Sequence, residues 1–198
     1  MTPDLEVHPL TRERLPDLAA LFGQGGDPKW CWCAFFRVRG MTFQNASASE
    51  NRAVLERGVD GLGGRAPGLI AYRDGEAIGW VSLGPREDYE RLQHSKILAP
   101  IDDKAVWSIV CFVVGRRARG QGVASALLEA AVQYAREHGA TLLEGYPVET
   151  DGGRIPSANA FKGTLSMFER AGFKVVERRR WNRTTPVRPI VRRRVRPG

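Results

Sequence analysis

Apolar and polar positions change their spacing along the chain in a way that predicts alternating strands and helices. Short segments rich in valine, isoleucine and aromatic residues predict strands at residues 5–9, 69–74, 77–84, 105–114, 141–148, 173–181 and 188–195. Segments with apolar residues three or four positions apart predict helices at residues 11–22, 47–57, 123–139 and 158–170, with a polar helical connection at 85–95. Strands that alternate with helices are typical of an α/β protein, so we expect one α/β domain with a mixed central sheet.

Local signals mark the ends of several of these elements. Thr11 is the expected N-cap of the first helix, because its hydroxyl group can accept a hydrogen bond from a free main-chain N–H group. Ser47 and Glu50 have the spacing of a capping box at the start of the second helix. Asp74–Gly75 stands between two apolar runs, and this dipeptide favours the tight turn of a β-hairpin. The sequence therefore predicts two capped helices followed by a hairpin.

The charge of the chain is concentrated at its carboxyl-terminal end. Of the 198 residues, 42% are apolar and 26% are charged, as in ordinary globular proteins, and the net charge is +8. Residues 178–198 hold nine arginines and no acid, while the rest of the chain is close to neutral. Because valine and isoleucine separate these arginines, we expect Arg-rich strands and a tail that belong to a single 1–198 domain. A nucleic-acid partner is not expected.

Three observations bear on where the protein works. The longest apolar run, residues 105–114, is far shorter than the roughly 20 residues that a membrane helix needs. The first ten residues carry Asp4 and Glu6 and have no apolar core, unlike a secretory signal. Three cysteines are an odd number and do not predict a disulfide framework. We therefore expect a cytoplasmic protein that does not enter a membrane.

The segment 112–125, FVVGRRARGQGVAS, carries the clearest chemical signal. A buried strand is followed by a basic turn and then by a long helix, whose first main-chain N–H groups have no acceptor within the helix. Together with the helix dipole, these groups favour a phosphate or pyrophosphate. The segment has neither the Gly-Lys-Ser/Thr end of a Walker loop nor the three glycines of a dinucleotide fingerprint. An ordinary helix-start turn with solvated arginines remains the alternative.

The pattern Arg-x-x-Gly-x-Ala at Arg119, Gly122 and Ala124 resembles the acyl-CoA-binding motif of the GNAT superfamily of N-acyltransferases. The segment SMFERAGF at 166–173 is similar to the late helix of that family, and the order of predicted elements also matches. The resemblance implies about seven strands, of which the fourth and fifth splay apart, and about four helices. It also implies an enzyme that transfers acetyl from acetyl-CoA directly to a primary amine of a small molecule, without a metal.

The same resemblance assigns the residues that would hold acetyl-CoA. The main chain around Phe112, Val113 and Val114 would pair with the pantetheine arm like an additional strand. The start of the following helix would hold the pyrophosphate. The residues assigned to it are Arg119, Gly120, Gln121, Gly122, Val123, Ala124 and Ser125.

The chain departs from the family at both positions that usually carry out proton transfer. The strand positions that often hold a general base are Ser108 and Val110, and the late-helix tyrosine is replaced by Phe168. The nearest substitutes are Glu144, Tyr146 and Glu149, and the first two share one strand face by alternation. The alternatives are that Glu144 is a salt-bridged strand acid and that Tyr146 is only packed.

Cys31 and Cys33 invite a metal interpretation, but a structural zinc site needs four ligands in paired groups. The surrounding aromatic residues, Trp30, Trp32, Phe35 and Phe36, favour a packed wall beside the acceptor site. Arg86 and Glu87 are weaker candidates for the border of that site.

Two functions besides small-molecule acetylation remain open from the sequence. One is a CoA-binding sensory or regulatory module without turnover, which the missing tyrosine and strand acid would favour. The other is a protein N-acetyltransferase. The sequence does not identify the amine acceptor or the acyl chain length, and it leaves open whether the chain acts alone or as a homodimer.

Overall fold

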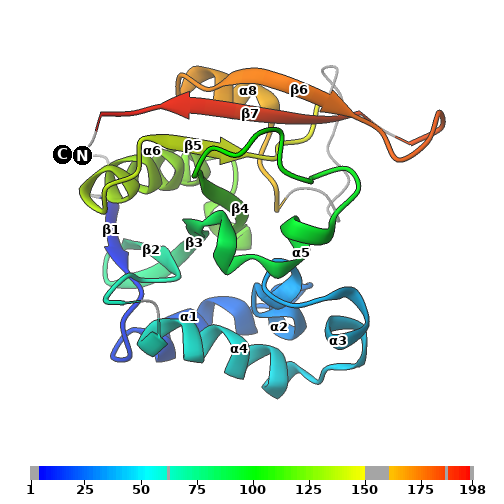
Figure 1. Ribbon diagram of the computed structural model, residues 1–198. Coiled ribbons are helices and arrows are strands. Elements are labelled where there is room, and N and C mark those ends of the chain that lie inside the picture. Colours follow the sequence, from blue (N-terminus) through cyan, green and yellow to red (C-terminus); the bar gives the residue numbers. More distant parts are fainter. Residues whose placement is uncertain (1–4, 62, 150–160, 186, 197–198) are drawn as a thin grey trace.

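A seven-stranded sheet runs through the centre of the computed structural model, which describes residues 5–61, 63–149, 161–185 and 187–196 (Figure 1). The strands are β1 (Leu5–Pro9), β2 (Gly68–Arg73), β3 (Glu76–Pro85), β4 (Trp107–Val114), β5 (Leu142–Gly145), β6 (Lys174–Arg179) and β7 (Arg188–Arg194). Their order is β1-β2-β3-β4-β5-β7-β6, and β4–β5 is the parallel pair. The predicted mixed sheet is confirmed.

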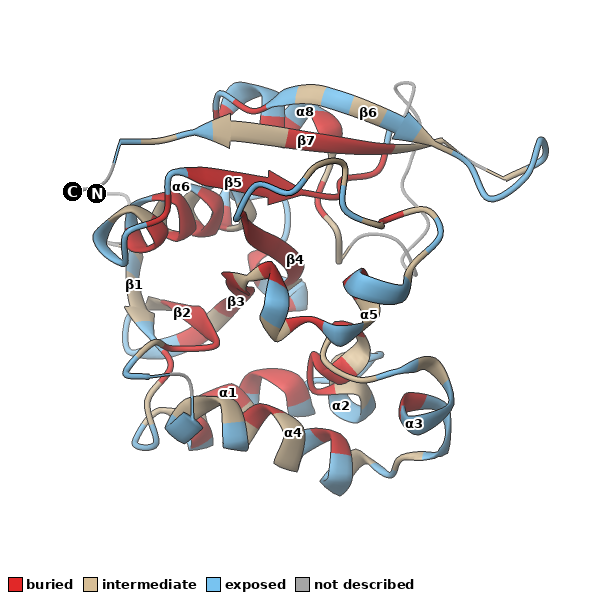
Figure 2. Cartoon of the chain, in the orientation of Figure 1, coloured by how far each residue is buried: buried red, intermediate tan, exposed pale blue. Residues whose placement is uncertain are grey.

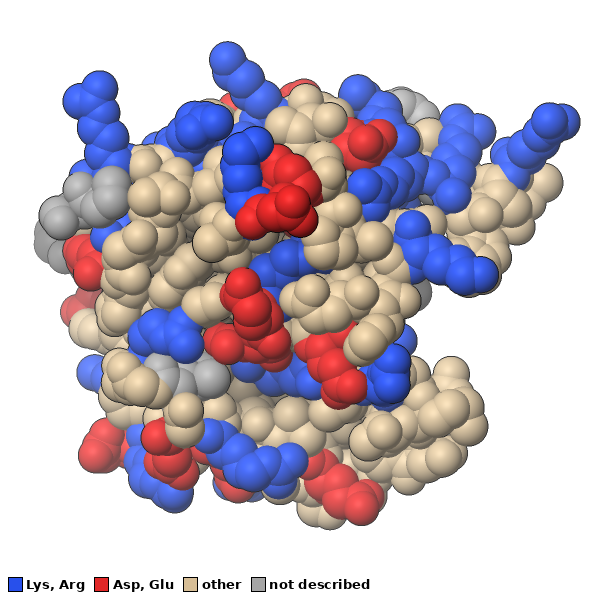
Figure 3. Space-filling model, viewed as in Figure 1, with Lys and Arg blue, Asp and Glu red and all other residues tan. Residues whose placement is uncertain are grey.

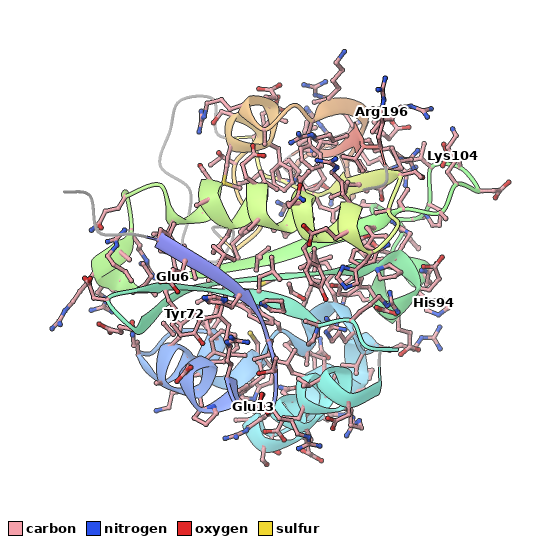
Figure 4. All side chains as sticks on the ribbon, turned by 90° about the vertical axis from the view of Figure 1, so that its left-hand side faces the viewer. Glu6, Glu13, Tyr72, His94, Lys104 and Arg196 are labelled. Atoms are coloured by element: carbon pink, nitrogen blue, oxygen red, sulfur yellow. The ribbon has the colours of Figure 1, made fainter. Side chains whose placement is uncertain are left out.

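Helices cover both faces of the sheet, as the turned view in Figure 4 shows. One layer contains α1 (Leu15–Gly23), α2 (Pro28–Cys31), α3 (Gly40–Asn45), α4 (Ala48–Gly61) and α5 (Glu90–His94), and the other contains α6 (Val123–Glu137) and α8 (Leu165–Arg170). Single turns of 3-10 helix are η1 (Ala34–Phe36), η2 (Arg86–Asp88) and η3 (Arg116–Ala118). Within the described ranges, no helix is long and apolar enough to cross a membrane.

Two apolar cores, one on each face, explain why β4 is an almost continuous apolar run. Leu127, Leu128 and Ala131 of α6 belong to the core on one face, and Phe22 of α1 and Trp80 of β3 belong to the core on the other. The first six residues of β4 are buried, and Figure 2 shows the buried colour running through β4 and β5. A strand that is covered on both faces has no solvent-facing positions at which polar side chains would be favoured.

Short-range signals in the sequence correctly placed the hairpin and one helix start. Asp74 and Gly75 have φ angles of 51° and 76°, the left-handed conformation that a type I′ turn requires. The main-chain N–H of Ser47 donates to Glu50 at 2.7 Å, and the N–H of Glu50 donates to the Ser47 hydroxyl at 3.3 Å. The predicted hairpin and capping box are therefore confirmed, and the helix continues to Gly61.

Two predicted helix starts are wrong. Thr11 does not cap α1, which begins at Leu15 with no side-chain cap. Pro16 explains the later start, because proline is favoured in the first helical turn, where its missing N–H costs nothing. The helix predicted at 158–170 begins only at Leu165, where the Thr164 hydroxyl accepts a hydrogen bond from the N–H of Met167. Residues 158–160 lie outside the described residues.

The number of helices also differs from the expectation. The described residues contain seven α-helices where about four were expected. The helices that the sequence analysis did not anticipate are α2 and α3, with four and six residues. Segments this short do not complete two turns, so they leave no readable periodicity.

An irregularity in β4 coincides with the point where β4 and β5 separate. Cys111 and Ile109 lie opposite consecutive residues of β3, so Val110 is an additional residue in β4, as in a β-bulge. The parallel pairing of β4 with β5 spans three residue pairs and ends at Ile109 and Gly145. Because a bulge bends its strand, the carboxyl-terminal half of β4 departs from β5 beyond this point.

Candidate active site

The turn between β4 and α6 is followed by main-chain donors that have no acceptor within the helix. Gly122 precedes the helix with a φ angle of 78°, and its carbonyl accepts the N–H of Ala126 at 3.0 Å. The N–H groups of residues 123–125 therefore precede the first intrahelical donor. A Cβ atom added at Gly120 or Gly122 would have no heavy atom within 4 Å, so space is open above the turn. This geometry fits a pyrophosphate.

Basic side chains surround the same turn. Arg116, Arg117 and Arg119 are exposed. The Nε of Arg119 donates to the carbonyl of Val114 at 3.2 Å, which ties the turn to the end of β4. Gln121 donates to the carbonyl of Arg117 at 2.7 Å. The turn thus combines a fixed main chain with a positive field, as an anion site requires.

The space beyond the β4–β5 pairing is occupied by the chain itself. The N–H of Phe112 donates to the carbonyl of Phe161 at 2.6 Å. On the other side, Val148 donates to Gly163 at 3.0 Å and accepts from Leu165 at 2.9 Å. Residues 161–165 therefore lie between β4 and the continuation of β5. Pairing of a pantetheine arm with the main chain of Phe112 requires the Phe161 carbonyl to leave this N–H group.

Glu144 and Tyr146 lie together, on one strand face as expected, in a buried network of polar side chains. The Tyr146 hydroxyl donates to Oε1 of Glu144 at 2.7 Å, and Arg86 donates to the same oxygen at 2.6 Å. Arg192 donates to Oε2 of Glu144 at 2.7 Å and to Asp102 at 2.8 Å. Glu144 is only 1% exposed. Its two oxygens therefore accept hydrogen bonds from two guanidinium groups and one phenol. These are the surroundings of a salt-bridged strand acid, one of the alternatives that the sequence left open for Glu144.

Tyr146 is placed to hold a proton. Its hydroxyl is within 2.7 Å of Arg86 and 2.9 Å of Ser108, and the side chain is buried. Burial and the charge of Glu144 raise the pKa of Tyr146 well above the usual value for a tyrosine. The phenol is therefore neutral at physiological pH and can act as a proton donor.

Glu149 lies outside this network, four residues beyond the end of β5. Its side chain is exposed and pairs with Arg178 of β6 at 3.3 Å.

The sequence analysis missed the two arginines that hold Glu144. Arg192 lies opposite Glu144 in the β5–β7 register, so only the strand order could have revealed it. Arg86 was considered only as a border residue, although it is 6% exposed and lies at the centre of the network.

The positions where the family usually places its base and acid have packing roles in this chain. The ring of Phe168 lies directly over Gly145, where an added Cβ would come within 2.3 Å of a ring carbon. Ser108 is fully buried and bonds to Tyr146. Gly145 is thus required for close packing of α8 on β5, and the ring of Phe168 has no polar atom to offer.

Aromatic residues of the amino-terminal segment pack against the segment that fills the gap. The rings of Phe35 and Phe36 each lie 6.4 Å from that of Phe161. Trp32 and Cys33 are buried, as expected of a packed wall. Among the described residues, no three His, Cys, Asp or Glu side chains are grouped to hold a metal ion.

Lys162 is a further residue that the sequence analysis missed. It follows Phe161 directly, and its Nζ lies 5.3 Å from the centre of the Phe161 ring. Burial, and then the charge of Arg188, lower the pKa of Lys162 to about 8. A larger fraction of this amine is therefore neutral at physiological pH than for an ordinary lysine.

Most arginines of the carboxyl-terminal segment lie on the strands β6 and β7. Figure 3 shows basic side chains over β6 and β7 at the top of this face, with acidic side chains between them. Four of the arginines bond to other parts of the chain: Arg178 to Glu149, Arg179 to the carbonyl of Ala99, Arg192 to Glu144 and Asp102, and Arg193 to Glu129. These arginines therefore connect β6 and β7, two strands of the central sheet, to other parts of the chain.

Comparison with known proteins agrees with this architecture. An N-acetyltransferase from Staphylococcus aureus Mu50 superposes with a TM-score of 0.56 at 15% identity, covering 96% of this chain and 98% of that protein. The ribosomal-protein-S18-alanine N-acetyltransferase from Escherichia coli gives a TM-score of 0.55 at 14% identity, with 98% and 95% covered. A mutant agmatine N-acetyltransferase without ligand gives 0.58 at 11% identity, with 97% and 100% covered. These likenesses show the fold.

Among curated proteins, none matches the chain. The model of the acetyltransferase (GNAT) family, in contrast, matches residues 30–156, which is more than half of the chain. The match includes β4, the turn at Gly122 and the start of α6. The chain therefore belongs to the GNAT family of acetyltransferases and is an acyl-CoA N-acyltransferase.

Proposed function

We propose that the chain transfers acetyl from acetyl-CoA directly to a primary amine of a small molecule. The observation that carries this proposal is the open, glycine-lined start of α6, which follows the end of β4 by a short turn. The N–H groups of Gly120 to Ser125 would bind the pyrophosphate, with Arg119 beside it. Phe112, Val113 and Val114 would orient the pantetheine arm. Acetyl-CoA supplies the activated acyl group, and the chain supplies orientation and proton transfer.

The proposed chemistry assigns proton transfer to groups around the gap. The amine attacks the thioester carbonyl, the C–S bond breaks, and the thiolate takes up a proton. Tyr146 is the proposed donor of that proton, and Glu144 with Arg86 positions its hydroxyl. Lys162 is a base beside the gap that can accept the proton of an incoming ammonium ion. Glu149, exposed four residues beyond the end of β5, remains a weaker proposal for the same role.

The acceptor is proposed as a small amine that enters past the aromatic wall. Related folds include one enzyme named for agmatine and one named for a ribosomal protein, so both acceptor classes occur on this architecture. The aromatic residues Phe35, Phe36 and Phe161 present apolar surface next to the gap, which suits a small organic amine. A protein amino terminus is the alternative acceptor. Location in the cytoplasm stays a prediction from the sequence.

The test of the proposal is release of free CoA thiol from acetyl-CoA in the presence of a panel of small amines. We expect Tyr146→Phe to lower kcat by about 100-fold or more, because the leaving thiolate loses its proton donor. Tyr72→Phe is the matched control, since Tyr72 lies on β2, beside the edge strand β1 and away from β5, and its hydroxyl donates to Asp17 (Figure 4). Equal kcat values for both variants would refute the role of Tyr146. Binding of acetyl-CoA without turnover on any amine would favour a sensory module.

A second experiment addresses the segment that fills the gap. Phe161→Ala removes the ring that packs against Phe35 and Phe36, so the Phe161 carbonyl is held less firmly on Phe112. If acetyl-CoA binds only after the bond between Phe112 and Phe161 opens, a larger fraction of the variant molecules is ready to bind it. Acetyl-CoA should then bind about 3- to 10-fold more tightly. Calorimetric titration measures this change. Phe43→Ala is the control, because Phe43 packs on Phe35 and Trp30 without a ring contact to Phe161. An unchanged or weaker affinity in Phe161→Ala would show that the bond need not open.

A further inference from the structure

Two cysteines that are far apart in the sequence form a buried pair next to the proposed site. Cys33 lies in the aromatic segment before η1, and Cys111 lies on β4, 78 positions later. Their sulfur atoms are 3.4 Å apart, and both residues are free thiols that are almost fully buried. Neither group has a part in the proposed acyl transfer. The proposed acyl transfer therefore does not explain why these two thiols lie together.

The polar contacts of this pair make the two sulfur atoms unequal. The sulfur of Cys33 shares a hydrogen bond with the sulfur of Cys111 and, at 3.1 Å, accepts the indole N–H of the fully buried Trp80. These bonds and the charge of Arg37 lower the pKa of Cys33, although burial opposes the effect. The hydrogen bond between the two sulfur atoms, together with burial, raises the pKa of Cys111 well above its usual value. Of the two thiols, Cys33 is thus the one that loses its proton more readily, and Cys111 is the one that holds its proton more firmly.

The main chain is strained in order to place Cys33 there. Trp32 and Cys33 have φ angles of 44° and 53°, so two consecutive residues with side chains adopt the left-handed conformation. Such residues cost free energy and persist only where the surrounding structure holds them. Cys31, two positions earlier, makes no bond to Cys111 among the described contacts, and burial raises the pKa of its thiol to about 12. Cys31 therefore differs from Cys33 both in its contacts and in the direction of its pKa shift.

We propose that Cys33 and Cys111 are an oxidisable dithiol, a modification site that a small hydroperoxide such as hydrogen peroxide converts into a disulfide. The thiolate of Cys33 attacks one peroxide oxygen, the O–O bond breaks, and the departing hydroxide leaves as water after taking a proton. The sulfur of Cys111 then attacks the sulfenic acid at Cys33, the S–O bond breaks, and the second oxygen leaves as water with the proton of Cys111. Two thiols lose two electrons, and one peroxide is reduced to two waters.

The disulfide would join the aromatic segment to the strand that borders the gap. Cys111 immediately precedes Phe112, whose N–H group faces residues 161–165. The segment of Cys33 includes Phe35 and Phe36, which pack against Phe161. Oxidation would thus fix the wall of the proposed acceptor site relative to β4. Formation of the disulfide does not depend on the proposed function, because it needs only the two thiols and the peroxide.

The experiment counts thiols in the purified full-length protein after treatment with hydrogen peroxide. The treated protein is denatured and alkylated with N-ethylmaleimide, and its mass and proteolytic peptides are measured. We expect one alkylated thiol instead of three, a mass 2 Da lower before alkylation, and a reducible link between the peptides of Cys33 and Cys111. Cys31→Ser should still form this link, while Cys33→Ser and Cys111→Ser should not.

Three results would overturn the proposal. These are retention of all three thiols at a peroxide dose that oxidises glutathione in the same tube, a link that involves Cys31, and a link between two chains. The peptide map of the unmodified chain decides the question even if a serine variant fails to fold. As a second measurement, the melting temperature of the oxidised protein should rise by several degrees and return on reduction, because the link closes a loop of almost 80 residues.

Discussion

Gly122→Trp is expected to abolish the stabilisation of the protein by acetyl-CoA while leaving the fold intact. At a concentration 100-fold above its Kd, a ligand that binds only the folded protein stabilises it by about 2.7 kcal/mol. For a chain of this size, that is a rise in melting temperature of roughly 5–10 °C. An indole at residue 122 would fill the open space above the turn and cover the N–H groups at the start of α6. The thermal shift should then fall to zero.

A control variant must show that the response is lost because the N–H groups are covered. It must exclude the loss of stability that any side chain causes in the left-handed conformation. Gly139 at the other end of α6 provides it, because its φ angle of 81° is close to the 78° of Gly122 and an added Cβ also meets no heavy atom within 4 Å. Gly139→Trp should lose a similar amount of stability, about 1–2 kcal/mol, and still respond fully to acetyl-CoA. Loss of the response in both variants, or in neither, would contradict a pyrophosphate site at the start of α6.

The parts of the fold that the sequence predicted are those set by residues close together in the chain. The hairpin at Asp74–Gly75 and the capping box at Ser47 depend on hydrogen bonds within four positions, so local residue type decides them. The turn at Gly122 belongs to the same class. The start of α1 was wrong because a proline outweighed a threonine as the start signal. Local patterns also do not show that Gly163, with a φ angle of 73°, keeps residues 161–164 out of the helix.

The parts of the site that the sequence did not predict depend on contacts between distant segments. Strand alternation placed Glu144 and Tyr146 on one face, and the two side chains do bond to each other. The partners that engage Glu144 come from residues 86 and 192, and no spacing rule connects these positions with β5. Similarly, the bond between Phe112 and Phe161 joins two segments whose proximity depends on the bulge in β4. Long-range register, rather than composition, decides which polar groups meet.

Glu144→Leu should destabilise the protein far more than a change at an exposed carboxylate. Glu144 is 1% exposed and balances Arg86 and Arg192, whose side chains are 7% and 10% exposed. Removing one partner of a buried ion pair leaves an uncompensated charge in a medium that solvates it poorly, which typically costs about 3–5 kcal/mol. Urea denaturation, with the midpoint and the slope fitted separately, measures the free energy of unfolding.

Glu149→Leu is the matched control for this loss, because Glu149 follows the same strand by four residues and pairs with Arg178 at the surface. Exposed pairs contribute about 0–1 kcal/mol, so this variant should stay close to the parent protein. The double variant Glu144→Leu/Arg192→Leu should lose less than the sum of its two single variants, since it removes one of the stranded charges together with its partner. Arg86 would still donate to the carbonyl of Leu92 at 3.0 Å, so recovery would be partial. Equal losses for Glu144→Leu and Glu149→Leu, or strict additivity in the double variant, would mean that the network does not act as one unit.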